Sequence, residues 1–346
     1  MPAALAGARI PALMDALLTL LARVLVLVLG SLPERAALAF AALVGHLGYY
    51  LMGSRRRIAL KNLELAYGKE KTPAERRRIA RASFRNAAMI AVDLARMPRF
   101  TPEVAKAKIR VENEEGLAGP PKQGRGVLAL SAHLGSFEVL AAGSGRLGLN
   151  RGTNLIGRPP RNSGAGRLLL SLRESAGVHT IESDGAVADV VSRMKENAET
   201  VGIVLDQNWR HGIFVDFFGV PAKTAPGLAV MHRKAIGCVA LVPVFTARDR
   251  DDWTKHRIYV EKELPYERAD SEADEVWVNT QRYTTIIEEY VRRFPEQWFW
   301  AHDRWKSRPN TEEMLELEAR RARYGALLAV GASTPAASAA PSDRSS

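Results

Sequence analysis

Two apolar stretches open the chain. The first runs from Leu13 to Leu29 and is interrupted by Asp15 and Arg23, and the second runs from Ala36 to Met52. A helix that spans a bilayer needs about 20 apolar residues, a length that neither stretch reaches without interruption. Basic residues follow at Arg55, Arg56, Arg57 and Lys61. We predict a membrane-anchored or interfacial segment over residues 1–54, with two buried core helices as the alternative. Because basic residues beside a membrane segment favour the cytoplasmic side, the domain that follows is expected on that side.

Further along the chain, apolar runs alternate with helical patterns. Runs typical of buried strands occur at residues 126–130, 201–205 and 238–245, and helices are predicted over residues 73–96, 186–197 and 273–293. This alternation predicts an α/β fold with a mostly parallel sheet flanked by helices. We assign it to one folded domain over residues 55–328. The remaining tail, residues 329–346, is rich in Ser and Ala and is predicted to be disordered.

Composition narrows the class of protein but not its partner. The 346 residues are 47% hydrophobic and 25% charged, which indicates a packed body. The formal charge of +11 favours an anionic partner, whether nucleic acid, acidic lipid headgroups or an acidic carrier protein. The seven histidines show no short metal-ligand spacing and Cys238 is the single cysteine, so we predict neither a metal site nor an intrachain disulfide.

His133 is the strongest candidate for chemistry. It follows the apolar run at residues 126–130, and parallel α/β sheets bind ligands at that carboxyl end of their strands. Glu138 lies five residues later, and a chain turn at Gly135 would let it reach back to His133, which one continuous helix would not allow. A histidine whose other ring nitrogen is held by a carboxylate is suited to remove the proton of a hydroxyl group. Spacing alone is weak evidence, because this pair occurs often by chance.

Five separated blocks give the pair its context. They are His133 with Glu138, Arg158-Pro159, Asp206-Gln207, FFGVPAKTAPG at residues 217–227, and PEQ at residues 295–297 followed by WAHDRWK at residues 300–306. In this order they resemble the lipid A late acyltransferases, the lauroyl and myristoyl transferases of the glycerolipid acyltransferase superfamily, over roughly residues 13–309. The sequence departs from the family pattern at Ser136-Phe137, where Asn-Trp is common, and at residues 160–166, a loop rich in small residues.

The resemblance implies a glycerolipid acyltransferase-like fold and an O-acyltransferase that needs no cofactor. The donor would be an acyl thioester of acyl carrier protein or coenzyme A, and the acceptor a hydroxyl of a membrane glycolipid similar to a lipid A precursor. His133 would be the general base, assisted by Glu138. Substrate-binding roles would fall to Arg158, Asp206, Gly219 and Thr224, with the planar Arg158 suited to a phosphate. Trp209, Phe214, Phe217 and Phe218 are candidates for the wall of an acyl-chain groove.

The implied setting is the inner membrane, with the catalytic domain at the cytoplasmic face against anionic lipid and with no nucleic acid as partner. Three alternatives remain open from the sequence. The acceptor could be another polar lipid, such as a phosphoinositide mannoside. The same pair could activate water in a lipid ester hydrolase. A basic protein that binds a membrane surface or nucleic acid without catalysis is the third.

Overall fold

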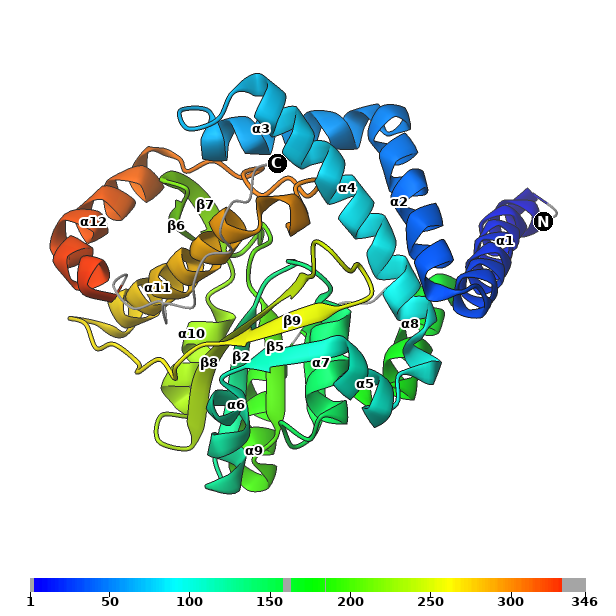
Figure 1. Cartoon of the computed structure of the whole chain (residues 1–346). Coiled ribbons are helices and arrows are strands. Elements are labelled where there is room, and N and C mark those ends of the chain that lie inside the picture. The colour runs from blue at the N-terminus through cyan, green and yellow to red at the C-terminus, as the bar shows by residue number, and fades with distance from the viewer. Residues whose placement is uncertain (1–2, 158–162, 184, 332–346) are drawn as a thin grey trace.

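A computed structural model describes residues 3–157, 163–183 and 185–331 (Figure 1). Its centre is a seven-stranded sheet with the order β1-β9-β8-β2-β5-β3-β4. The strands are β1 (Ile109–Glu112), β2 (Gly126–Ser131), β3 (Thr153–Gly157), β4 (Val178–Glu182), β5 (Thr200–Val204), β8 (Val239–Arg248) and β9 (His256–Val260). Arg158 lies outside the described residues, as does the tail from residue 332 onward.

The direction of the strands confirms the predicted fold class. The five neighbours from β8 to β4 run parallel, β9 is antiparallel to β8, and β1 pairs in parallel with β9. The apolar pattern does not reveal β4 or the antiparallel hairpin of β6 (Ile213–Phe217) and β7 (Val220–Thr224). These strands are short and mix polar with apolar residues, so they lack the continuous apolar run of a central strand.

Helices cover both faces of the sheet. They are α5 (Pro102–Lys108), α6 (Glu114–Lys122), α7 (Phe137–Arg146), α8 (Gly164–Ser175), α9 (Ala186–Asn197), α10 (Gly227–Lys234) and α11 (Glu272–Arg293), with 3-10 turns η1 (Met97–Arg99) and η2 (Pro295–Gln297). The last helix, α12 (Thr311–Gly331), packs on α11 and β6. Successive residues of β2 serve opposite faces. Val127 packs in one core with residues of α7, and Leu128 and Leu130 pack in the other with residues of α9, α10 and α11.

Four helices precede the sheet: α1 (Ala3–Ser31), α2 (Glu34–Leu51), α3 (Gly53–Tyr67) and α4 (Pro73–Ala95). The start of α4 is a capping box, in which the Thr72 hydroxyl accepts from the Glu75 N–H and the Glu75 carboxylate accepts from the Thr72 N–H. This confirms the predicted helix start. The predicted domain boundary between residues 54 and 55 falls inside α3 and stays a prediction.

The first two helices expose large apolar side chains. Leu27 is 69% exposed and Leu51 is 82% exposed. Among the described residues, Met14–Ser31 is the one helical window long and apolar enough to cross a membrane, and the pair α2 and α3, bent by 88°, would count as a second if it were one span. Only 11% of the residues in the Met14–Ser31 window are buried, so α1 is not a core helix of the body.

Gly45 lies where α2 packs tightly against α4. A Cβ atom there would lie 2.5 Å from the Phe84 carbonyl oxygen, whereas a Cβ at Gly48 would have no atom nearer than 3.8 Å. We expect Gly45→Ala to destabilise the protein by roughly 1–3 kcal/mol through overpacking. The matched change Gly48→Ala should be neutral, or stabilising by up to about 1 kcal/mol through helix propensity. Thermal melts of the detergent-solubilised chain measure both, and equal Tm shifts would contradict this packing.

Candidate active site

The turn after β2 places His133 at the carboxyl edge of the sheet. Gly135 has a φ of +57°, and a Cβ there would overlap the Thr246 carbonyl group of β8, so this turn requires glycine. The segment after α11 holds the turn from outside. The Gly135 N–H donates to the Gln297 carbonyl oxygen at 3.1 Å, and the Phe299 N–H donates to the His133 carbonyl oxygen at 3.2 Å. Backbone contacts therefore fix the position of His133.

The carboxylate that binds the imidazole is that of Asp206. His133 Nδ1 lies 2.8 Å from Asp206 Oδ1, and the His133 backbone N–H donates to Oδ2 at 2.8 Å. Asp206 follows β5, which pairs in parallel with β2, so both residues lie at the same edge of the sheet. From the sequence, Asp206 is a candidate for substrate binding, and its contact with His133 is missed. The available signal was its position directly after the apolar run at residues 201–205.

Asp206 keeps its charge although its side chain is only 1% exposed. Burial acts to raise the pKa of Asp206, but the charge of His133 and the hydrogen bonds donated by His133 and Trp298 outweigh it and hold this pKa below its ordinary value. The Trp298 indole N–H donates to Oδ2 at 2.6 Å. Because an ionised carboxylate only accepts hydrogen bonds, the proton of a neutral His133 ring lies on Nδ1.

The second ring nitrogen of His133 is then the basic one. Nε2 lies 3.2 Å from the Gln207 side-chain nitrogen, which donates to it in this tautomer. The His133 side chain is 20% exposed and lines a groove of about 170 Å³. Apolar side chains form much of the groove wall, at Ala87, Ile90, Phe137, Trp298 and Phe299. A base whose side chain lines a largely apolar groove is suited to deprotonate a hydroxyl group attached to a lipid.

Glu138 forms no hydrogen bond with His133, which corrects the predicted pairing. Its carboxylate, 4% exposed, accepts from Arg173 of α8, from Nε at 3.0 Å and from Nη2 at 2.7 Å. The reason is that α7 begins at Phe137, directly after the Gly135 turn, so Glu138 belongs to the first helical turn. Phe137 is the neighbour on α7 that contacts the imidazole, edge to face with 5.1 Å between ring centroids. The catalytic role of Glu138 stays a prediction.

The other predicted substrate-binding residues do not line the groove beside His133 in the described part of the chain. Gly219 and Phe218 form the turn of the β6–β7 hairpin with φ values of 67° and 56°, the left-handed pair that a two-residue turn requires. Thr224 is fully buried, and its hydroxyl accepts from Arg304 Nη2 at 2.5 Å. Their binding roles stay predictions, as does that of Arg158, which lies outside the described residues.

The predicted aromatic wall of an acyl groove is mostly core. Phe214, Phe217 and Phe218 are all buried. The Phe217 ring stacks on Trp305 with 5.6 Å between centroids and meets Trp298 edge to face at 5.7 Å. Phe217 therefore supports Trp298, which donates to Asp206, rather than an open groove.

The family model that describes bacterial lipid A biosynthesis acyltransferases matches residues 12–307, which includes all the elements that build this site. The chain belongs to the bacterial lipid A biosynthesis acyltransferase family. It is therefore an O-acyltransferase, in agreement with the prediction from the sequence blocks.

Named relatives of this acyltransferase are similar over most of their length. It is 27% identical over 282 residues to the lipid A biosynthesis palmitoleoyltransferase of Escherichia coli (strain K12), covering 79% of this chain and 85% of that protein. It is 26% identical over 276 residues to the lipid A biosynthesis lauroyltransferase of the same organism, covering 77% and 84%. A crystal structure of the 1-acyl-sn-glycerophosphate acyltransferase PlsC from Thermotoga maritima matches with 15% identity and a TM-score of 0.33, covering 77% of this chain and 98% of that chain.

The change Asp206→Asn tests whether this carboxylate sets the state of the acyltransferase's histidine. The amide keeps the size of the side chain but removes its charge, and its NH₂ group can donate toward Nδ1 and favour the wrong tautomer. We expect turnover to fall roughly 1,000- to 10,000-fold, as for the equivalent change in a serine protease triad. Glu138→Gln is the matched carboxylate-to-amide control, and we expect a smaller loss. Steady-state rates on purified protein measure both, and normal turnover of Asp206→Asn would remove Asp206 from the mechanism.

Proposed function

We propose that this acyltransferase moves a fatty acyl chain from a thioester to a hydroxyl group of a membrane glycolipid similar to a lipid A precursor. The observation that carries the proposal is the His133–Asp206 pair, in which the His133 side chain lines a largely apolar groove. The acceptor class is supported by the names of the two relatives, which are transferases of lipid A biosynthesis.

The reaction needs one group that first accepts and then returns a proton. The acceptor hydroxyl replaces the Gln207 side chain at His133 Nε2, which removes the hydroxyl proton as the acceptor oxygen attacks the thioester carbonyl carbon. Asp206 stabilises the imidazolium that forms. When the tetrahedral intermediate collapses, the carbon–sulfur bond breaks and the leaving thiolate takes the proton from Nε2. The products are an ester and a thiol, and His133 is neutral again.

Glu138 and Arg158 take supporting roles in this proposal. Glu138 acts through its buried ion pair with Arg173, which ties the start of α7, and hence Phe137 beside the imidazole, to α8. Removing one partner of a buried ion pair leaves the other charge uncompensated, which costs about 3–5 kcal/mol. Arg158 binds a phosphate group of the acceptor or of the donor, as its planar fork allows.

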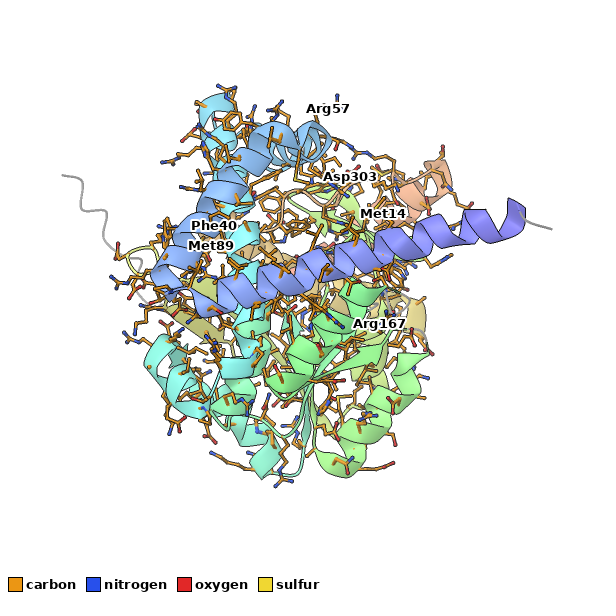
Figure 2. The ribbon with its side chains drawn as sticks, turned by 90° about the vertical axis from the view of Figure 1, so that its right-hand side faces the viewer. Met14, Phe40, Arg57, Met89, Arg167 and Asp303 are labelled. Atoms are coloured by element: carbon orange, nitrogen blue, oxygen red, sulfur yellow. The ribbon has the colours of Figure 1, made fainter. Side chains whose placement is uncertain are left out.

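The proposed setting is the cytoplasmic face of the inner membrane, where α1 and α2 meet the lipid with their exposed apolar side chains. Arg55 and Arg57 are exposed on α3, directly after this apolar surface (Figure 2). Each basic residue close to an anionic membrane contributes about 1 kcal/mol of attraction. The net charge of +11 also suits an acidic carrier protein as thioester donor, with coenzyme A as the alternative.

Acyl transfer is tested by incubating the purified protein with a lipid A precursor and an acyl thioester. Mass spectrometry should show an acceptor heavier by one acyl group, and His133→Ala should lower its formation about 100- to 10,000-fold without unfolding the protein. Release of free fatty acid without an acylated acceptor would identify a hydrolase instead. A folded His133→Ala protein with full activity would end the proposed mechanism.

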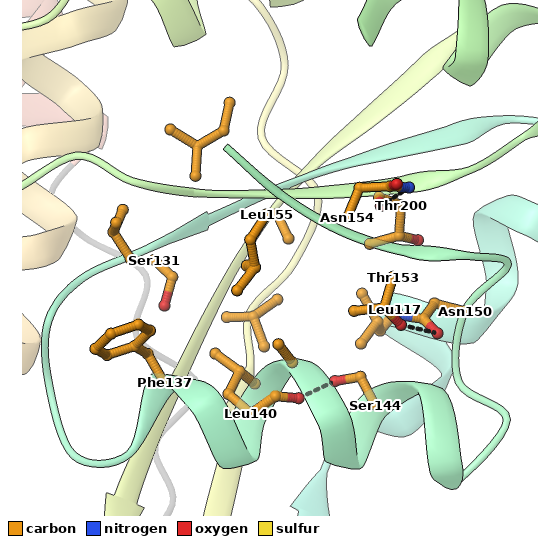
Figure 3. A pocket seen from close by; sticks show the side chains of 16 residues that line it. Leu117, Ser131, Phe137, Leu140, Ser144, Asn150, Thr153, Asn154, Leu155 and Thr200 are labelled. Atoms are coloured by element: carbon orange, nitrogen blue, oxygen red, sulfur yellow. Dashed lines mark hydrogen bonds between the residues drawn. The ribbon is translucent and has the colours of Figure 1, made fainter. Parts of the chain in front are cut away.

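A narrow apolar cavity between α7 and the sheet is the proposed binding site for the acyl chain. Phe137 lines both the groove at His133 and this cavity, which continues between α7 and strands β2, β3 and β5 (Figure 3). Leu140 and Leu155 form part of its wall. Its volume is about 40 Å³, so a chain enters only when these side chains move apart.

Gly202 of β5 and Leu155 of β3 offer a way to change the size of the proposed cavity. A Cβ there would lie 2.9 Å from Leu155 Cδ2, so Gly202→Ala narrows the cavity and Leu155→Ala widens it. We expect Gly202→Ala to shift the preferred acyl chain to a shorter one and Leu155→Ala to a longer one, with the double variant in between. One methylene in an apolar pocket changes discrimination roughly 10- to 200-fold. Product ratios from a mixture of thioesters measure this, and unchanged ratios in both single variants would place the acyl chain elsewhere.

A further inference from the structure

Helix α1 touches the body along a single stripe. Between residues 14 and 29, the side chains that are not exposed belong to Asp15, Thr19, Ala22, Val26 and Leu29, at spacings of three and four residues. Such spacing places them on one face of a helix, while the remaining apolar side chains stay exposed. Asp15 and Thr19 are the polar residues of this face, whereas Arg23, the other residue that interrupts the apolar stretch, is exposed.

That face meets the first turn of α8. The Gly164 N–H lies 3.1 Å and 3.2 Å from the two Asp15 carboxylate oxygens, and the Ser163 hydroxyl accepts from the Gly166 N–H at 3.0 Å. A carboxylate is favourable at a helix N-terminus, where backbone N–H groups lack partners. A Cβ at Gly164 would overlap the Thr19 side chain. The absence of a side chain at Gly164 therefore lets α1 lie against α8 (Figure 2).

The other end of α1 is also held by charged side chains. Arg96 Nη1 donates to the Leu32 carbonyl oxygen at 3.0 Å and to those of Leu29 and Gly30 at 3.4 Å. Arg99 also donates to the Gly30 carbonyl oxygen. Cations are favourable at a helix C-terminus, so both ends of the stripe are fixed to the body by charge.

Helix α8 links this contact to the active site. Arg173 follows Gly164 by nine residues, roughly 14 Å along the helix axis. Its guanidinium group binds the buried Glu138 carboxylate at the start of α7 and donates to the Thr180 hydroxyl at 3.3 Å. Next to Glu138, Phe137 contacts the His133 ring. A displacement of α8 therefore reaches the groove through one ion pair.

We propose that Asp15 is a positioning residue for acyl transfer, an inference that rests on the proposed function. Through the contact of Asp15 with Gly164 the apolar helix α1 seats α8, and α8 in turn holds Glu138, and with it Phe137, which lies beside His133. Helix α1 is then a part of the active site's support, in addition to its contribution to membrane binding. Loss of this seat lowers turnover while the chain remains on the membrane.

The test uses the full chain in vesicles of phosphatidylethanolamine and phosphatidylglycerol. Gly164→Ala introduces the overlap with Thr19, and we expect kcat to fall roughly 10- to 100-fold, the scale of a misplacement near 1 Å. Adding Thr19→Gly removes the overlapping side chain and should restore most of kcat. Gly53→Ala is the matched control, because a Cβ there meets no atom within 4 Å, and it should retain full activity. Asp15→Asn, which keeps the shape but removes the charge, should lower kcat a few-fold.

Vesicle flotation separates positioning from anchoring. All variants should float as the natural chain does, and the thermal melt of the double variant should fall by no more than the roughly 1 kcal/mol that a glycine costs inside a helix. Full kcat in Gly164→Ala, or a folded double variant that is as inactive as Gly164→Ala alone, would overturn the proposal. So would a loss of activity that matches a loss of flotation, since α1 would then act only as an anchor. If the natural chain itself transfers no acyl group, the proposed function fails rather than this inference.

Discussion

The buried charge of Asp206 is the constraint on which the rest of the site depends. A carboxylate that is 1% exposed must be satisfied by donors, and it receives them from the His133 ring, the His133 backbone and the Trp298 indole. These donors come from two parts of the chain, the turn after β2 and the segment after α11. The carboxylate thus joins two segments that are far apart in sequence, and it fixes the orientation of the imidazole at the same time.

Buried aromatic side chains and the buried Arg304 support this carboxylate indirectly, through the core. Arg304 is fully buried and donates to the Lys223 carbonyl oxygen at 2.8 Å and to the Thr224 hydroxyl. These contacts of Arg304 with β7 explain why the hairpin of β6 and β7 belongs to the same sequence pattern as the active site, although the hairpin residues lie outside the groove. Phe217 packs between Trp298 and Trp305, so the hairpin braces the tryptophan whose indole binds Asp206. The block at residues 217–227 therefore meets the block at residues 300–306 in the core rather than in the groove.

Local physics made much of the fold predictable. The capping box at Thr72, the apolar runs that became β2, β5 and β8, and the position of His133 after β2 all follow from neighbouring residues. The partner of His133 does not, because Asp206 is 73 residues away and the pairing depends on the strand order. Glu138 is the nearer carboxylate in sequence, but it lies in the first turn of the helix that starts at Phe137, and its carboxylate binds the guanidinium group of Arg173 from α8. Neither the helix start nor the ion pair can be predicted from the spacing of His133 and Glu138.

The polar residues of α1 show the same dependence on distant partners. In the sequence, Asp15 reads as an interruption of an apolar span, which weakens the prediction of a membrane segment. In the structure its carboxylate faces the N–H of Gly164, so its polarity is satisfied by the body while the rest of the helix keeps an apolar surface. A helix of this kind meets two environments at once, with the stripe that contains Asp15 and Thr19 against protein and the apolar side chains of the remaining sides free for lipid. The enzyme's acceptor is proposed to reside in that lipid, so a helix that contacts both lipid and α8 joins the substrate's environment to the support of His133.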